Sequence, residues 1–147
     1  MRGQCLCGAV TFELSGPVPG FYQCHCSLCR RQSGAASNAA TLVPPDRFRW
    51  LTGADRIGAY VRSSGYRVHF CKDCASPVPN PTRGGSLMWI PAGLLEDDPA
   101  IRVVAHLHVA SRASWDRIPD DVAAFDTMPD IAALIALLDP VAVSGHR

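Results

Sequence analysis

The chain has 147 residues, of which 48% are hydrophobic and 18% charged, a composition that supplies a core and excludes intrinsic disorder. Fourteen basic and thirteen acidic residues leave a net charge of +1, so no long-range field attracts nucleic acid or an anionic membrane. No apolar run is long enough to cross a membrane, and the first residues do not resemble a secretion signal. We therefore expect a single cytoplasmic domain over residues 1–147 that binds neither membrane nor nucleic acid.

The first predicted elements are short strands separated by many turns. In residues 10–14, Val10, Phe12 and Leu14 alternate with less apolar residues, which is the pattern of a strand with one buried face. Gly, Pro, Ser or Asp bounds each of the segments that follow. The further predicted strands are residues 20–23, 36–42, 57–62, 66–70, 87–90 and 102–109. A mainly β fold follows.

One helix is predicted, at residues 130–139. Ile131, Leu134, Ile135 and Leu138 are spaced at i, i+3, i+4 and i+7, and Asp130 suits the helix N-terminus. We expect this helix to cover an apolar side of the sheet. Its apolar surface is wider than one stripe, so the sequence leaves a dimer contact and the oligomeric state open.

Seven cysteines are the unusual feature of the composition, and all fall in tight clusters. In a chain without a secretion signal, clustered cysteines more often bind metal than form disulfides, and an odd number cannot all pair. The clusters are Cys5-Leu6-Cys7, Cys24-His25-Cys26-Ser27-Leu28-Cys29 and Cys71-Lys72-Asp73-Cys74. A redox role for Cys71 and Cys74 is disfavoured, because a predicted strand precedes this pair where a redox motif opens a helix.

The cysteines divide between metal ions in two ways. The two flanking pairs can close a tetrahedral zinc site, which leaves Cys24, Cys26 and Cys29 to bind a second ion with one open position, as in catalytic zinc sites. Alternatively His25 completes a second closed site, and both ions are structural. A ring between two ligands usually points away from the metal, which disfavours His25 as a ligand.

These motifs resemble the glutathione-dependent formaldehyde-activating enzyme family, which includes centromere protein V and has the Mss4-like fold. The family pattern C-x-C-G-x-V, C-H-C-x-x-C-R and F-C-x-x-C-G is matched at all seven cysteines, and the resemblance covers about residues 3–126. It implies a curved β-sheet fold, two zinc ions per chain and a carbon-sulfur lyase that joins glutathione to formaldehyde or reverses that reaction. It implies a structural zinc on Cys5, Cys7, Cys71 and Cys74, and a catalytic zinc on Cys24, Cys26 and Cys29.

Two residues near the clusters carry separate expectations. Ala75 stands where the family usually has glycine, so a positive φ there would strain the chain by roughly 1 kcal/mol. Arg30, directly after Cys29, either binds a substrate carboxylate or balances thiolate charge, whereas Arg31 is expected to be a solvated surface charge.

Three aromatic residues late in the chain are further candidates for the site or the core. His106 and His108 are expected on one face of a strand. His106 matches a family position, so it lines the catalytic site or serves as a hydrogen-bonded structural residue. Trp115 is expected in the core. The rival function is a non-catalytic zinc scaffold that binds protein or nucleic acid, and a single lysine disfavours the nucleic-acid version.

Overall fold

The computed structural model describes residues 1–139, which form twelve β-strands, two α-helices and four short 3-10 helices. The prediction of a mainly β chain with a short C-terminal helix is confirmed. The chain divides into two units. Among the described residues, the first unit comprises Met1–Val18 and Leu42–Asp98, and the second comprises Pro19–Thr41 and residues 99–139.

The first sheet of the first unit is antiparallel, with strand order β1-β2-β5. Its strands are β1 (Arg2–Gln4), β2 (Thr11–Leu14) and β5 (Phe48–Thr52). In β2 the predicted alternation is realised, because Phe12 and Leu14 are buried whereas Thr11 and Glu13 are partly exposed. The first strand of the chain is β1, which precedes the first cysteine pair and was not predicted, and β5 was also missed.

A second antiparallel sheet of this unit has the order β6-β7-β8, and a hairpin follows it. The sheet consists of β6 (Ile57–Val61), β7 (Arg67–Cys71) and β8 (Pro77–Val78), and the hairpin of β9 (Asn80–Pro81) and β10 (Met88–Pro91). Three 3-10 helices lie in this unit, at Pro45–Arg47, Ala54–Arg56 and Ala92–Leu94, and the second of them connects β5 to β6.

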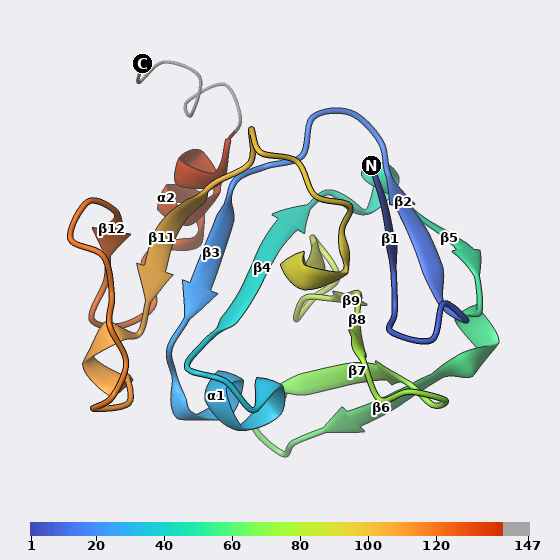
Figure 1. The fold of residues 1–147 in the computed structure, drawn as a ribbon, viewed down its shortest axis with the longest axis horizontal. Helices are drawn as coiled ribbons and strands as arrows, with labels where there is room; N and C mark the ends of the chain where they lie inside the picture. The colour runs from blue at the N-terminus through green and yellow to red at the C-terminus, as the bar shows by residue number, and fades with distance from the viewer. Residues whose placement is uncertain (140–147) are drawn as a thin grey trace. The chain divides into compact units, whose positions relative to one another are not determined.

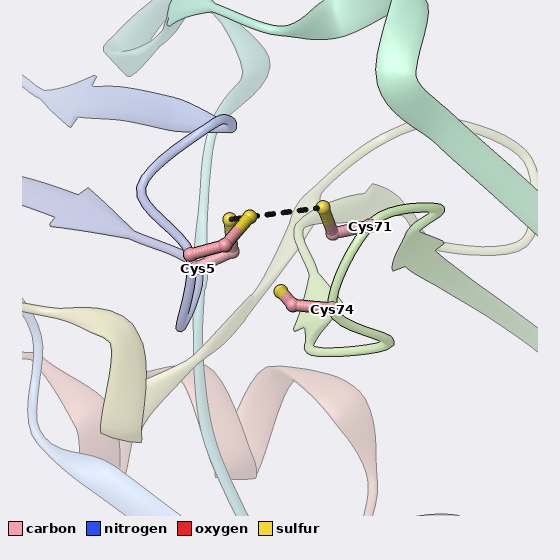
Figure 2. A group of neighbouring side chains, drawn as sticks. Cys5, Cys71 and Cys74 are labelled. Atoms are coloured by element: carbon pink, nitrogen blue, oxygen red, sulfur yellow. Dashed lines mark hydrogen bonds between the residues drawn. The ribbon is translucent and has the colours of Figure 1, made fainter.

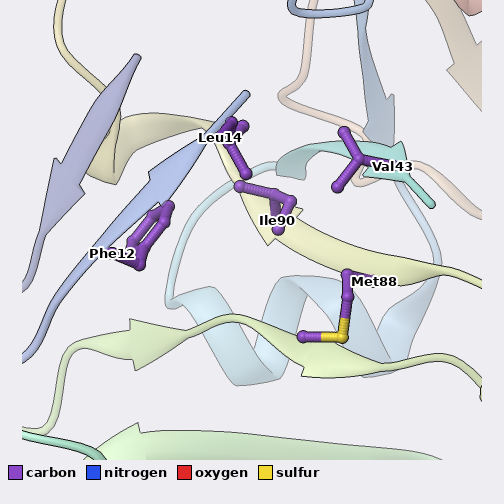
Figure 3. Packing of buried hydrophobic residues seen from close by; sticks show 5 residues of the cluster. All are labelled: Phe12, Leu14, Val43, Met88 and Ile90. Carbon is purple, nitrogen blue, oxygen red and sulfur yellow. The ribbon is translucent and has the colours of Figure 1, made fainter. Parts of the chain in front are cut away.

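Two buried clusters form the core of the first unit. Figure 3 shows the larger cluster, which consists of Phe12, Leu14, Val43, Met88 and Ile90. The smaller one consists of Cys5, Val10, Cys71 and Val78. One cysteine of each flanking pair is therefore anchored in apolar packing. That packing fixes the positions of Cys5 and Cys71, the first cysteine of each pair.

In the second unit, parallel pairing brings two distant segments side by side (Figure 1). The strand order is β12-β11-β3-β4, in which β11 (Val103–Leu107) is parallel to both β3 (Phe21–Cys24) and β12 (Ala123–Ala124). The strand β4 (Asn38–Val43), whose last two residues belong to the first unit, is antiparallel to β3. Because the register places Leu107 opposite Cys24, the ends of β3 and β11 meet beside the central cysteine cluster.

The predicted C-terminal helix is α2 (Ile131–Leu138), and it contacts β11. The Asp130 side chain accepts hydrogen bonds from the amides of residues 132 and 133, as an N-cap residue does. Leu134 and Leu138 are buried, whereas Ile131 and Ile135 are 47% and 43% exposed. The helix therefore covers the sheet with one stripe, and its wider apolar surface faces outward. Within the described residues, no helix is long and apolar enough to span a membrane.

Candidate metal centres

The two flanking cysteine pairs converge in the first unit. Cys5 and Cys7 lie in the loop after β1, Cys71 ends β7, and Cys74 lies in the turn that follows it. Their four sulfur atoms lie within 4.8 Å of one another. Figure 2 shows that the labelled side chains Cys5, Cys71 and Cys74 point into the space between the two loops. This arrangement agrees with the sequence-based expectation that the two flanking cysteine pairs meet at one site.

The sulfur separations suit a tetrahedral ion. Cys7 Sγ lies 3.6 Å from Cys5 Sγ and 3.8 Å from Cys71 Sγ. A zinc–sulfur bond of about 2.3 Å in a tetrahedron places two sulfurs about 3.8 Å apart, so these edges already have the required length. Four soft donors at this spacing can hold a zinc-type cation.

Backbone hydrogen bonds close both loops tightly. The Cys5 amide donates to the Val10 carbonyl (3.0 Å), and the Val10 amide donates to Cys5 Sγ (3.3 Å). In the other loop the Ala75 amide donates to the Cys71 carbonyl (2.8 Å), and Ala75 adopts φ 63°. The strained left-handed conformation expected for Ala75 is therefore present.

The neighbouring thiols of this cluster shift one another's pKa values in opposite directions. The Ser76 hydroxyl and then the Ser76 backbone, both by hydrogen bonding, lower the pKa of Cys74 to about 6. A backbone hydrogen bond with Ala9 lowers the pKa of Cys7, but desolvation and the neighbouring thiols together outweigh it and raise that pKa to about 12. Four thiolates this close repel one another, and a bound cation would remove that repulsion.

The central cysteines converge in the second unit. Cys24 ends β3, Cys26 is the N-cap of helix α1 (Ser27–Ser33), and Cys29 lies in its first turn. The three sulfurs lie within 4.8 Å of one another, and within residues 1–139 no histidine, aspartate, glutamate or further cysteine joins the group. The Cys29 amide donates to Cys26 Sγ at 3.4 Å. This cluster therefore offers three ligands where the other offers four.

Hydrogen bonding and charge also favour a thiolate in this second cluster. A hydrogen bond from Cys29 is the largest cause that lowers the pKa of Cys24, to about 6, although burial opposes it. Hydrogen bonds from Cys26 and the charge of His108 act in the same direction. A thiol with this pKa is largely ionised at neutral pH and is ready to bind a metal.

Sequence reasoning missed helix α1, which holds two of the three sulfurs. It is only seven residues long and has no buried residue, so it carries no apolar periodicity. Its signals are at its ends, where Cys26 Sγ caps the N-terminus and Gly34 adopts φ 68° at the C-terminus. Arg30 and Arg31 in the last turn also complement the helix dipole.

A hydrogen-bonded chain of two buried histidines and one partly buried aspartate lies beside the central cluster. His25 Nδ1 is 2.7 Å from Asp116 Oδ2, and His25 Nε2 is 2.9 Å from His106 Nδ1. Both histidines are 2% exposed. Because both ring nitrogens of His25 are engaged, the ring does not join the sulfur cluster, and the arrangement argues against the all-structural alternative in which His25 is a ligand. His106 is thus a hydrogen-bonded residue, and its pKa is lowered by burial and then by the charge of His25.

Two expectations for this region are wrong. His108 does not share a strand face with His106, because β11 ends at Leu107 and His108 adopts the left-handed conformation with φ 56°. That conformation starts the 3-10 helix Val109–Ser111. Trp115 is not in the core but 67% exposed, because it lies in a loop of mostly exposed residues.

The two arginines after Cys29 differ as expected in their surroundings. Arg31 is exposed, which agrees with a surface charge. Arg30 is half-buried, and its Nη2 donates to the Ser111 carbonyl at 3.3 Å. Its Nε is buried without a hydrogen-bond partner in the described chain. Arg30 therefore retains an unused donor next to the three-cysteine cluster.

Comparison with known proteins assigns the family. The model of the family described as "Glutathione-dependent formaldehyde-activating enzyme" matches residues 1–111. The chain belongs to this family. A protein of Halomonas elongata, provisionally named a glutathione-dependent formaldehyde-activating enzyme, is 35% identical over 85 residues, which are 53% of this chain and 54% of the relative. The chain thus spans about half the length of that curated relative.

A solved structure shares the fold. The crystal structure of a Rhodobacter sphaeroides protein superimposes with a TM-score of 0.57 and 23% sequence identity. The match covers 71% of this chain and all of that protein. At this identity the likeness concerns the fold of the chain alone.

Proposed function

We propose that this chain is a zinc-dependent carbon-sulfur lyase that joins a small thiol, with glutathione as the leading candidate, to formaldehyde, or reverses that reaction. In the forward direction the thiol sulfur forms a bond to the carbonyl carbon. The π bond of the carbonyl breaks, and its electron pair forms the O–H bond of the new hydroxyl group. The hydroxyl proton balances the one lost by the thiol. The product is an S-hydroxymethyl thiol, and no oxidant or reductant is required.

The observation that carries the proposal is the contrast between the two cysteine clusters. Four sulfurs complete the coordination of a tetrahedral ion, whereas three leave one position for an exchangeable ligand. All donors are soft thiolates, which favours zinc over hard cations. When bound at Cys24, Cys26 and Cys29, zinc would supply a position at which a substrate thiol ionises near neutral pH.

Residues around the central cluster have defined parts in the proposal. Cys24, Cys26 and Cys29 hold the ion, and the low pKa of Cys24 prepares the first of these ligands without a strong base. Arg30 is assigned to a carboxylate of the thiol substrate, because its half-buried guanidinium, which donates to the Ser111 carbonyl, belongs to the residue directly after Cys29. His106 is held beside this region by its hydrogen bond with His25 and supports the site through that contact.

The other four cysteines have a structural part. Cys5, Cys7, Cys71 and Cys74 bind a second zinc whose coordination is complete, so that ion would not exchange ligands with a substrate. We propose that both sites serve one functional domain in the cytoplasm. Seven cysteines outside disulfides suit a reducing compartment.

Cobalt substitution tests the proposal directly. We would load the chain with cobalt and titrate it with glutathione and non-peptide thiols, because an added thiolate ligand changes the charge-transfer and ligand-field bands. Formaldehyde consumption would then be followed with each thiol that binds. The expected result is a saturable spectral change and turnover that are both lost in Cys26→Ser, while the spectrum of the four-cysteine site persists.

Two outcomes would contradict the proposal. Thiol binding without any turnover would indicate a thiol-binding protein rather than a lyase. An unchanged cobalt spectrum with every thiol, together with a fourth protein ligand on the ion, would indicate a zinc scaffold. Apo protein reconstituted with zinc serves as the control for damage during metal exchange.

A further inference from the structure

We propose that Asp116 is a positioning residue for the three-cysteine site and acts through the ring of His25. The inference rests on the proposed metal site at Cys24, Cys26 and Cys29 and assigns it a supporting contact. Asp116 is far from these cysteines in sequence, yet its carboxylate lies 2.7 Å from His25 Nδ1. His25 stands between two of the three ligands, so whatever holds His25 also holds the loop that carries Cys24 and Cys26.

His25 is held at three points, each on a different partner. Its backbone amide donates to the Leu107 carbonyl at 2.9 Å. Its ring contacts Asp116 at one nitrogen and His106 at the other, with side-chain exposures of only 3% for His25 and 10% for Asp116. A buried ion pair or charged hydrogen bond of this kind loses much of its stabilisation when one partner is removed. The loop is therefore fixed more firmly than backbone contacts alone would fix it.

The contacts also determine where the ring protons lie. A carboxylate only accepts hydrogen bonds, so Asp116 requires a proton on His25 Nδ1. In a neutral His25 ring the other nitrogen, Nε2, then carries a lone pair and accepts a hydrogen bond from His106 Nδ1–H. Both neutral rings consequently carry their proton on Nδ1, which leaves His106 Nε2 as an acceptor. This pattern is a signature of the Asp116 contact that general packing would not produce.

The ring protons can be observed in the zinc-loaded protein. Long-range nitrogen–proton correlation spectra distinguish which ring nitrogen of each histidine carries the proton. We expect the Nδ1–H form for His25 and His106 in the wild type. In Asp116→Ala we expect the Nε2–H form to appear at His25. A wild-type His25 protonated at Nε2 alone would overturn the proposal without any variant.

Metal affinity provides the second readout, by competition with a chromophoric chelator. Asp116→Ala should weaken binding at the three-cysteine site roughly 10-fold, near the lower limit for loss of outer-shell contacts, and should leave the four-cysteine site unchanged. Asp116→Asn should recover most of the affinity, because its amide oxygen can accept from the same ring nitrogen. The exposed Asp126, on the same segment of the chain, gives the matched control Asp126→Ala, which should behave as wild type.

The outcomes separate this inference from the proposed function. Equal weakening of both sites, or equal affinity in Asp116→Ala and Asp126→Ala, would overturn the positioning role. A wild-type protein that binds one zinc only would instead refute the proposed function and the metal-binding part of this inference. The ring spectra of that same protein would still decide whether Asp116 sets the histidine tautomers.

Discussion

Replacement of Ala75 by glycine should stabilise the protein, although glycine usually weakens a fold. Ala75 adopts φ 63°, and the left-handed conformation disfavours an L-residue by about 1–2 kcal/mol. Glycine removes that strain, but the greater conformational entropy it gives the unfolded chain destabilises the folded state by about 0.5–1 kcal/mol. The side chain is exposed, so its removal leaves no cavity. The balance favours Ala75→Gly by about 0.5–1 kcal/mol.

Thermal unfolding of the zinc-loaded protein measures this difference. For a chain of this length, 1 kcal/mol corresponds to roughly 2–4 °C in Tm, so we expect a rise of about 1–4 °C. Ala59 is the matched control, because it is exposed in the extended strand β6 of the same unit. Ala59→Gly should lower the Tm through the same entropy effect. Equal losses of Tm in the two variants, at equal zinc content, would refute the argument from strain.

Three further predictions concern the metal sites and the helix. Metal analysis of protein supplemented with zinc should give two ions per chain, and a stable value near one would count against the three-cysteine site. Cys5→Ser should unfold or aggregate the chain because a closed zinc site contributes folding free energy directly, whereas Cys26→Ser should melt as a folded protein because serine is also a good N-cap for α1. Leu134→Ala should cost about 2–5 kcal/mol because the side chain is fully buried, and the exposed Ile135→Ala should cost far less in the same denaturant titration.

Sequence patterns predicted those elements in which local periodicity and burial agree. In β2 the alternation of Phe12 and Leu14 matches the buried face, and in α2 Leu134 and Leu138 fall on one buried stripe. β1 has only three residues, too few to show a period, and its buried residue is Gly3, which gives no apolar signal. The missed elements are therefore those whose pattern is too short or too polar to stand out.

Spacing indicated the three local cysteine motifs but left open how they divide between metal ions, and it indicated nothing of their surroundings. Two sulfurs a few residues apart must lie close in space, which is why local motifs indicate metal sites. The contact between His25 and Asp116 joins residues 91 positions apart and depends on the parallel pairing of β3 and β11. The outward position of Trp115 likewise depends on a loop without periodic pattern.

The two clusters differ in how their loops are anchored, and the difference supports the proposed division of roles. In the first unit Cys5 and Cys71 belong to an apolar core cluster, so loss of the ion there would expose packed side chains. The central sulfurs instead rest on a strand end and on α1, a helix with no buried residue. Their loop is held by polar contacts through His25. Ligand exchange at the proposed open position would therefore act on a loop held by polar contacts, which fits the proposed thiol-binding centre.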